Sequence, residues 1–379
     1  MIGNVFFQFI QVELKCFVIR DLWWIFALVT RVFEFIDETA MRVKRIKFWI
    51  VAMAAAAAFF GCRPRSEDVA VARIDSHDKT RGIYHWKTTF DLTEKDKAFM
   101  KDHQITQLYV RMFDVGIEDN WDSGSGEVVP LGTTVFKCPV PEGCHVIPTV
   151  YITLDALKAY KGREPELADL IVERVYAMAS WNDLGEIKEI QYDCDWTAGT
   201  RPLFERLCEH TRKQIAGKGA ILSGTIRLHQ IEEAYYPFDK GVVMIYNTGS
   251  LKDASATNSI LYYDDVSKYL SVEKRINKFL KARNENCPVI EIAYPTYSWG
   301  VVYDYFEKTF KRLVSSKDEY EGHWSEYVRW ETSEITEIIK VKGLVDKTIG
   351  RAGHGNVIYH LDSDNLTKYN YDEIENIYN

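Results

Sequence analysis

Short apolar segments alternate with longer amphipathic segments from Gly82 to the end of the chain. The apolar segments are rich in β-branched and aromatic residues, and most of them are apolar on both faces, as strands buried on both sides of a sheet must be. We therefore predict eight strands, at residues 83–89, 107–113, 146–152, 187–194, 220–227, 241–247, 288–294 and 356–362.

Amphipathic patterns with a helical period separate most of these strands. They predict helices at residues 93–103, 165–181, 201–219, 264–285 and 303–316. The third of these helices ends at Gly217 and Gly219, where a helix C-terminus costs least. Successive strand–helix units predict a single (β/α)8 TIM-barrel domain over residues 82–379. The alternative is a doubly wound open sheet, but no GxGxxG motif follows the first strand.

Two connections break the alternation of strands and helices. Residues 114–145 contain Gly, Pro and Trp121 without a helical pattern, and residues 316–355 contain an additional helical pattern at 323–341. We expect both connections to form loops at the mouths of the barrel.

Residues 41–61 have the layout of a secretory signal. Basic residues precede an apolar run from Phe48 to Phe60, and Gly61 and Cys62 follow it. This ending resembles the lipobox of bacterial lipoproteins, which implies that Cys62 is lipidated and becomes the mature N-terminus. The alternative is an uncleaved membrane anchor, for which the apolar run is short against the roughly 20 residues of a membrane span.

The lipobox resemblance divides the chain into four parts. Residues 1–40 are expected to come from a misassigned start upstream of Met41, residues 41–61 form the signal peptide, 62–81 form a polar tether and 82–379 form the barrel. The same resemblance implies a membrane-anchored lipoprotein of the bacterial cell envelope, in the outer membrane.

Composition narrows the class of function. With 46% hydrophobic and 27% charged residues, the chain is expected to fold rather than to stay disordered. A net charge of −8 argues against nucleic acid as a partner, because binding to phosphates needs clustered Lys and Arg. The 22 Tyr and 10 Trp residues agree with a sugar ligand, since flat polar ligands stack on aromatic rings.

The cysteines and histidines do not indicate a metal. The sequence has no CxxC motif and no Cys/His cluster, so we expect neither zinc nor another cofactor. Cys138 and Cys144 bracket a short loop that contains Pro and Gly. In an exported protein they either form a disulfide or remain two thiols.

The segment IKEIQYDCDWT, residues 187–197, places two aspartates at the end of an apolar strand. Because side chains alternate along a strand, Gln191, Asp193 and Asp195 share one face. If that face is the inside of the barrel, they form a column toward the C-terminal end of the strands, where TIM-barrel active sites lie. The deeper Asp193 then needs a partner, and Arg227 on the next strand is the natural candidate.

Acid–base cleavage of a glycosidic bond needs carboxylates with separated pKa values. We predict that Asp195 is the catalytic acid or base and that Asp193 holds or tunes it; the alternative for Asp193 and Arg227 is a purely structural ion pair. Glu291 is predicted to be a second catalytic carboxylate, unless it faces a helix. A D-x-D pair can also hold a divalent metal with a phosphate substrate, but the chain lacks a phosphate-binding loop and we predict no metal.

Further polar and aromatic residues at the strand ends are predicted to contact the ligand. The Trp residues provide platforms for sugar rings, with packing in the core as the alternative for each. For the Arg and His residues the alternative is an internal network. The predicted substrate-binding residues are Trp86, Arg111, Gln191, Trp196, Arg227, Tyr246, Tyr294, Trp299 and His360.

The Q-x-D-x-D motif of the fourth strand, together with the barrel pattern and the lipoprotein leader, resembles an uncharacterised group of bacterial glycosidase-like TIM-barrel lipoproteins over most of residues 82–379. The strand also partly resembles the D-x-x-D-x-D-x-E motif of chitinase-like glycoside hydrolases, with Asp193 and Asp195 at its last two Asp positions. Ile190 stands in place of the first Asp and Thr197 in place of the catalytic Glu. The substrate-assisted hydrolysis of that family therefore cannot simply be carried over.

Together these observations predict a cell-envelope lipoprotein whose glycoside-hydrolase-like barrel acts on a carbohydrate by carboxylate acid–base chemistry. One alternative is a non-catalytic carbohydrate-binding barrel, which Thr197 favours. Another is an envelope scaffold whose barrel mouth is filled by its own loops. The expected partners are a carbohydrate and, through the lipid anchor, a membrane.

Overall fold

The computed structural model describes residues 81–120, 125–232, 235–246, 260–261, 263–285, 289–314, 317, 320–349 and 355–379. Cys62, the predicted signal peptide and residues 62–80 of the predicted tether lie outside these residues, so lipidation stays a prediction; Arg81, the last residue of the predicted tether, begins the first strand. None of the described helices is both long enough and apolar enough to cross a membrane.

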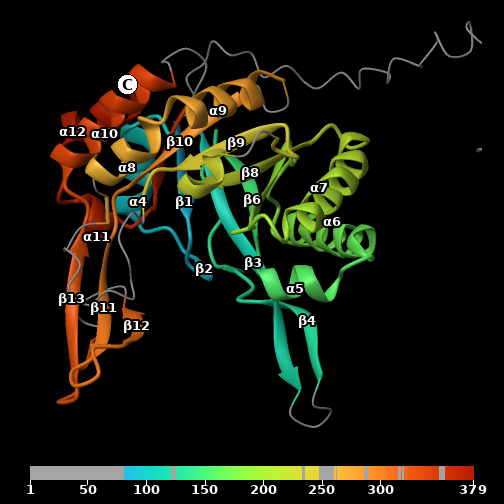
Figure 1. Cartoon of the computed structure of the whole chain (residues 1–379), viewed down its shortest axis with the longest axis horizontal. Coiled ribbons are helices and arrows are strands. Elements are labelled where there is room, and N and C mark those ends of the chain that lie inside the picture. Colours follow the sequence, from blue (N-terminus) through green and yellow to red (C-terminus); the bar gives the residue numbers. More distant parts are fainter. Residues whose placement is uncertain are drawn as a thin grey trace, which may run out of the picture. The chain divides into compact units, whose positions relative to one another are not determined.

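Parallel strands close into a barrel, which confirms the predicted TIM-barrel fold (Figure 1). Their order is β1-β14-β10-β9-β8-β7-β6-β3, and the pairing of β1 with β3 completes the circle. Each predicted strand overlaps one strand of the barrel. The barrel strands are β1 (Arg81–His85), β3 (Gln107–Asn120), β6 (His145–Ile152), β7 (Glu189–Asp193), β8 (Ile221–Arg227), β9 (Lys240–Met244), β10 (Val289–Pro295) and β14 (Asn356–Tyr359).

Two apolar cores lie on the two sides of the barrel wall. Alternation along each strand decides which core a side chain enters. On β7, Ile190 and Tyr192 join the outer core between the strands and the helices. Gln191 and Asp193 alternate with them and face the interior, where Tyr84 belongs to the inner core.

Helices cover the outside of the barrel. They are α4 (Glu94–Asp102), α5 (Leu154–Ala159), α6 (Glu164–Trp181), α7 (Arg201–Ala216), α8 (Tyr263–Leu270), α9 (Glu273–Glu285), α10 (Ile335–Thr348), α11 (Ser363–Leu366) and α12 (Tyr371–Tyr378), and the 3-10 helix η2 (Leu228–Glu232) follows β8.

Local signals fix the ends of several helices. Thr93 and Asp96 form a capping box at the start of α4, and α7 ends before Gly217. The helices predicted at 93–103, 165–181 and 201–219 are therefore confirmed as α4, α6 and α7. The helical pattern at 264–285 is divided between α8 and α9.

The connection after β3 contains an antiparallel hairpin. The C-terminal half of β3 runs beyond the barrel and pairs with β4 (Ser125–Leu131), with Asp114 opposite Leu131. Then β5 (Val135–Phe136) pairs with β2 (Thr89–Phe90). The described residues of 114–145 contain no helix, as the sequence predicted, but they form strands where we expected a loop at the mouth of the barrel.

The segment after β10 forms an antiparallel sheet, which we call the insert sheet. It consists of β11 (Ser298–Asp304), β12 (Phe310–Val314) and β13 (Glu326–Thr332), in the order β12-β11-β13. The predicted helix at 303–316 is therefore wrong. The helix predicted at 323–341 is correct only from Ile335, where α10 begins.

The error at 303–316 has a physical reason. Tyr303, Phe306, Phe310 and Leu313 recur with a helical spacing, but Lys308 adopts a positive φ of 57°, which turns the chain between β11 and β12. Residues of β11 are buried in the insert sheet because β11 pairs with β13, and this pairing joins residues far apart in the sequence. Local periodicity carries no information about such a partner.

The β3–β4 hairpin and the insert sheet extend from the same end of the barrel (Figure 1). β3 enters the hairpin with its C-terminal half, and β11 begins shortly after the C-terminal end of β10. Both projections therefore stand beside the C-terminal mouth, where the active sites of this fold lie.

Candidate functional site

Arg227, at the end of β8, lies between two aspartates at the end of the neighbouring β7. Its Nε donates a hydrogen bond to Oδ1 of Asp195 at 2.6 Å, and its Nη2 donates one to Oδ1 of Asp193 at 3.1 Å. The predicted pairing of Arg227 with Asp193 is confirmed, and the same arginine also holds Asp195. We call these three residues the Arg227 cluster.

The two aspartates of the Arg227 cluster differ in exposure. The Asp193 side chain is 4% exposed, whereas that of Asp195 is 44% exposed. Thr225 donates a further hydrogen bond to Asp193 at 2.6 Å. Burial raises the pKa of Asp193, and the charge of Arg227 opposes the rise. Asp193 is thus an enclosed group that positions Arg227, while Asp195 is open to a ligand.

Gln191 lies on the same face of β7, two residues deeper than Asp193. Its Oε1 accepts hydrogen bonds from the hydroxyl groups of Tyr84 at 2.7 Å and Thr149 at 3.3 Å. The side chain is fully buried. Gln191 therefore supports the site from within the barrel and does not reach the mouth.

Tyr151 on β6 lies opposite Asp193 of β7. Burial, followed by the negative charges of Asp195 and Asp193, raises the pKa of Tyr151 to about 12. The phenol stays protonated at neutral pH and is a hydrogen-bond donor close to the exposed carboxylate.

Aromatic rings gather at the mouth around Tyr359, the last residue of β14. Its ring centroid lies 5.8 Å from that of Trp86, 5.2 Å from that of Tyr246 and 5.3 Å from that of Tyr297. Trp299 of the insert sheet joins through Tyr297, at 5.1 Å. The structure thus brings together the predicted binding residues Trp86, Tyr246 and Trp299. We call these five residues the mouth aromatic cluster.

Charged groups lie near the mouth aromatic cluster. Burial, followed by the charge of Asp193, raises the pKa of Tyr359, so this ring lies near the Arg227 cluster. The guanidinium group of Arg111 lies over the ring of Trp86, 5.9 Å from its centroid, and donates to Asp114 at 2.8 Å. Arg111, also a predicted binding residue, is therefore placed beside the aromatic rings.

His360 follows β14 and packs beside Tyr297, with ring centroids 6.2 Å apart. Burial lowers the pKa of His360, which keeps the imidazole neutral at neutral pH. The structure places this predicted binding residue next to the mouth aromatic cluster.

Glu291 belongs to a second charged cluster, inside the barrel. Nζ of Lys240 lies 2.8 Å from Oε2 of Glu189 and 3.1 Å from Oε1 of Glu291, and the hydroxyl of Tyr109 donates to Glu291. All four residues, which we call the Lys240 cluster, are buried. Burial raises the pKa of Glu189, and Lys240 opposes the rise. Glu291 thus lies in an enclosed cluster, whereas Asp195 is exposed at the mouth.

Trp196 and Tyr294 lie in the outer core. Trp196 is buried and stacks on Phe204 of α7, with ring centroids 6.3 Å apart. Tyr294 is buried as well. The structure does not bring these two predicted binding residues to the inner face of the mouth.

Sequence reasoning missed three residues of the site. Strand alternation could have identified Thr225 and Tyr359. Thr225 lies two positions before Arg227, and Tyr359 lies two positions after Val357 of the inner core. Tyr297 follows β10, where no local signal shows that the chain returns to the mouth.

Neither a metal site nor a disulfide is present in the part of the chain that the structure describes. No group of three His, Cys, Asp or Glu side chains is arranged there to hold a metal ion. Of the two alternatives for Cys138 and Cys144, the structure shows two free thiols.

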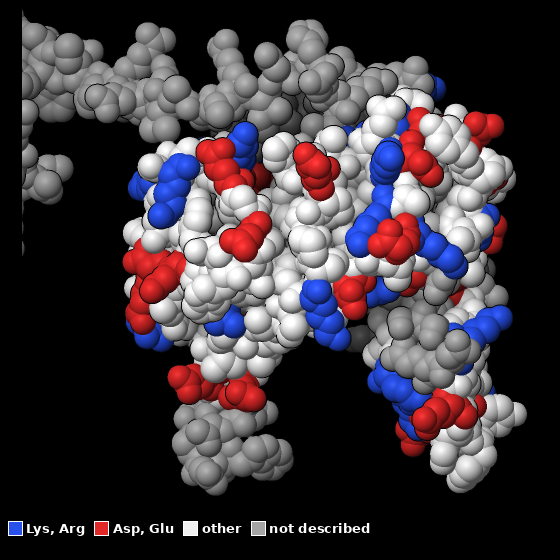
Figure 2. All heavy atoms as spheres, turned by 180° about the vertical axis from the view of Figure 1, so that it is seen from behind, with Lys and Arg blue, Asp and Glu red and all other residues white. Residues whose placement is uncertain are grey.

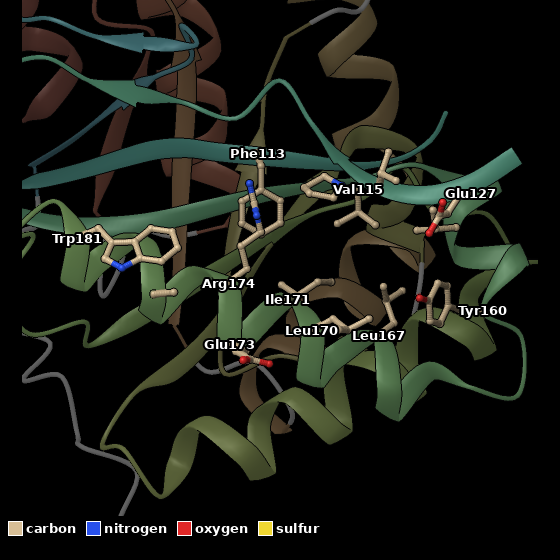
Figure 3. Close-up of a pocket in the computed structure, with 14 residues that line it drawn as sticks. Phe113, Val115, Glu127, Tyr160, Leu167, Leu170, Ile171, Glu173, Arg174 and Trp181 are labelled. Atoms are coloured by element: carbon tan, nitrogen blue, oxygen red, sulfur yellow. The ribbon is translucent and has the colours of Figure 1, made fainter. Parts of the chain in front are cut away.

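A groove of about 450 Å³ lies outside the barrel, between the β3–β4 hairpin and α6 (Figure 3). Phe113, Val115 and Ile171 are among its apolar lining residues. Arg174 extends across it, with its guanidinium group 5.1 Å from the centroid of the Phe113 ring. This groove is on the outer side of β3, whereas the Arg227 cluster and the mouth aromatic cluster face the interior.

The chemistry available at the mouth follows from these positions. A raised carboxyl pKa suits a general acid, but Asp193 is enclosed by Thr225 and Arg227. Thr197 is exposed just before α7, and its hydroxyl stays un-ionised at neutral pH, unlike a carboxylate. Asp195 is thus the accessible carboxylate of the Arg227 cluster. Tyr246 and Tyr297 are buried, so the site offers a carboxylate, a guanidinium group and the half-buried rings of Trp86, Trp299 and Tyr359 to a polar ligand.

No protein family and no curated protein sequence matches this chain. Among solved structures, it is similar to the spore cortex-lytic enzyme SleL from Bacillus megaterium QM B1551, with a TM-score of 0.48 and 11% identity over 80% of this chain and 75% of that chain. It is also similar to a chitinase from Chromobacterium violaceum ATCC 12472, with a TM-score of 0.45 and 12% identity over 76% of this chain and 97% of that chain. The class V chitinase of Nicotiana tobaccum, in complex with NAG4, has a TM-score of 0.48 and 12% identity over 79% and 98% of the two chains. Likeness at this level concerns the fold and assigns no activity.

Proposed function

We propose that this chain is a cell-envelope lipoprotein whose barrel, of glycoside-hydrolase type, acts on a carbohydrate at its C-terminal mouth. The observation that carries the proposal is the exposed carboxylate of Asp195, which is held by Arg227; the charge of Arg227 in turn acts on Tyr359 and Tyr246 of the mouth aromatic cluster. Sugar hydroxyls pair with charged groups of this kind, and the apolar faces of sugar rings stack on aromatic side chains. Asp195 acts as the acid or base, and Asp193 positions Arg227.

The proposal is tested by replacing Asp195 with Asn, which keeps the shape of the side chain but removes its charge and most of its ability to transfer a proton. Purified wild type is assayed against a panel of oligosaccharides for release of reducing sugar. Turnover by Asp195→Asn should fall by roughly 10²–10⁴-fold, while its thermal unfolding stays close to that of wild type.

Asp155→Asn on α5 is the matched control, because Asp155 is exposed and pairs only across the surface of its own helix with Lys158. It should retain wild-type turnover. Full turnover by Asp195→Asn would show that Asp195 is not the acid or base.

A second candidate, a non-catalytic carbohydrate-binding barrel, is favoured by Thr197 and by the enclosure of Asp193. In that case wild type binds a glycan in a titration without releasing reducing sugar, and Asp195→Asn weakens the binding. The two candidate functions therefore predict different turnover but the same position of the ligand.

The membrane anchor in the proposal rests on the sequence around Cys62. Cys62→Ser should abolish fatty-acid labelling and leave the chain unprocessed or released, because stable anchoring needs acyl chains once the apolar run is cleaved. Labelling that persists in this variant would remove the lipoprotein assignment and leave the barrel function unaffected.

A further inference from the structure

Three aromatic side chains are exposed together at one end of the insert sheet. Trp324 is 78% exposed, Phe306 is 66% exposed and Tyr305 is 51% exposed. The ring centroid of Phe306 lies 5.9 Å from that of Trp324 and 5.4 Å from that of Tyr305. We call these residues the tip cluster. Exposed apolar side chains that form one patch mark an interaction surface more often than isolated ones do.

The tip cluster lies at the end of the insert sheet that is farthest from the barrel. β11 leaves the barrel at Ser298 and ends at Asp304, opposite Glu326, the first residue of β13. The amide of Tyr305 donates to the carbonyl oxygen of Ser325 at 2.7 Å, which closes this end. At about 3.3 Å per residue, β11 places the tip cluster roughly 20 Å from the mouth. A ligand of several sugar units spans that distance.

Charges of both signs lie next to the tip cluster. Nζ of Lys308 lies over the ring of Tyr305, 4.5 Å from its centroid. Nζ of Lys311 lies 3.3 Å from Asp304 and 3.5 Å from Glu326, and Arg312 lies 2.8 Å from Glu326. Blue and red side chains lie next to one another on this projection, and its far end is largely uncharged (Figure 2). Balanced charge beside exposed rings suits a polysaccharide better than a nucleic acid or an anionic lipid surface, both of which require an excess of Lys and Arg.

We propose that the tip cluster binds a polymeric carbohydrate, as a second contact that holds the polymer across the barrel mouth. This inference rests on the proposed function, because it takes the ligand of the mouth to be a carbohydrate. Two linked contacts raise the apparent affinity for a polymer that reaches both of them, but not for an oligosaccharide that fills only the mouth.

The experiment measures retention of the full chain on insoluble chitin, cellulose and peptidoglycan, alongside titrations with soluble oligosaccharides. Wild type should be retained by at least one of the polymers. The double variant Phe306→Ala/Trp324→Ala should bind that polymer roughly tenfold more weakly, since stacking on two aromatic rings contributes on that scale, and should bind oligosaccharides like wild type.

Trp181→Ala is the matched control. Trp181 is 76% exposed on α6, on the outer side of the barrel, so the variant also removes an exposed Trp. It should bind the polymer and the oligosaccharides like wild type. Equal weakening of polymer binding by Trp181→Ala and by the double variant would show a nonspecific effect of surface aromatics and would overturn the inference.

The remaining outcomes separate this inference from the proposed function. If the double variant binds the polymer as tightly as wild type, while Asp195→Asn weakens oligosaccharide binding, the tip cluster is not a polymer site and the proposed function stands. If wild type binds neither polymer nor oligosaccharide, the proposed function is wrong, and the inference that rests on it is wrong as well. Sedimentation with phosphatidylglycerol vesicles that depends on Phe306 and Trp324, without retention on any polymer, would identify a membrane contact and overturn the inference.

Discussion

The Lys240 cluster and the Arg227 cluster contain the same arrangement, one cation between two carboxylates, in two parts of the barrel. In the Lys240 cluster both carboxylates are buried, and Lys240 itself is only 1% exposed. In the Arg227 cluster one carboxylate is buried, the arginine is half-buried, and the other carboxylate, on Asp195, faces the mouth. Exposure of a single carboxylate therefore distinguishes a cluster that fills the barrel from one that can meet a ligand.

The difference also sets the energetics of the two clusters. A buried charge is tolerated only when it is paired, so Lys240 is the counter-ion on which Glu189 and Glu291 depend. Water reaches Asp195 and weakens its attraction to Arg227. Substitutions in the Lys240 cluster should therefore change stability, while those at Asp195 should change function.

The largest effect is expected from Lys240→Ala. It leaves two buried carboxylates without their cation and should lower the free energy of unfolding by about 3–5 kcal/mol, measured by urea denaturation. Lys268→Ala removes an exposed lysine that pairs with Asp265 on α8 and should leave stability nearly unchanged. Equal stability of the two variants would contradict the structural role of the Lys240 cluster.

Asp193→Asn should have the next largest effect. The amide keeps the shape of the side chain, but it leaves the buried part of Arg227 less well compensated, so the free energy of unfolding should fall by about 1–3 kcal/mol in the same assay. Thr225→Val, which removes the hydroxyl that donates to Asp193, should destabilise less than Asp193→Asn. A variant as stable as wild type would show that Asp193 is not enclosed with Arg227.

The pH dependence of the free energy of unfolding gives a further test of the contrast between the Lys240 cluster and the Arg227 cluster. The pKa of Glu189 is raised in the folded protein, so its contribution is fully present below the ordinary carboxyl pKa and is lost as the pH rises through the raised value. The contribution of Glu189 should therefore fall with rising pH above the ordinary carboxyl range, by up to about 1.4 kcal/mol per pH unit for one proton, while the lowered pKa of His360 acts in the opposite direction up to the ordinary histidine pKa.

Glu189→Gln carries no proton to lose and should reduce this slope, measured as unfolding midpoints across pH. Asp193 also has a raised pKa and contributes with the same sign, so part of the slope should remain. An identical slope in wild type and Glu189→Gln would show that a group other than Glu189 causes the pH dependence.

The smallest effect on stability is expected from Asp195→Asn. Its carboxylate is partly exposed, and the ion pair with Arg227 should contribute at most about 1 kcal/mol to the free energy of unfolding. Combined with a large loss of turnover or binding, this would assign Asp195 to the ligand. A loss of stability as large as that of Asp193→Asn would instead make the Arg227 cluster structural throughout.

The sequence alone determined the barrel. Apolar strands separated by amphipathic helices are local patterns, and burial of both strand faces leaves few other folds. The same alternation placed Gln191, Asp193 and Asp195 on one face and selected Arg227 as the partner, because neighbouring parallel strands put their C-terminal ends side by side. These inferences needed only the order of residues along two strands.

Only the tertiary structure decided the rest of the site. It showed that Glu291 belongs to an enclosed cluster with Lys240, that Trp196 and Tyr294 enter the outer core, and that Tyr297 reaches the mouth. It also replaced the predicted helix at 303–316 with two strands of the insert sheet. For Glu291, Tyr297 and the insert sheet the deciding contact joins residues distant in sequence, and the local periodicity of a segment cannot specify a partner that it meets only after folding.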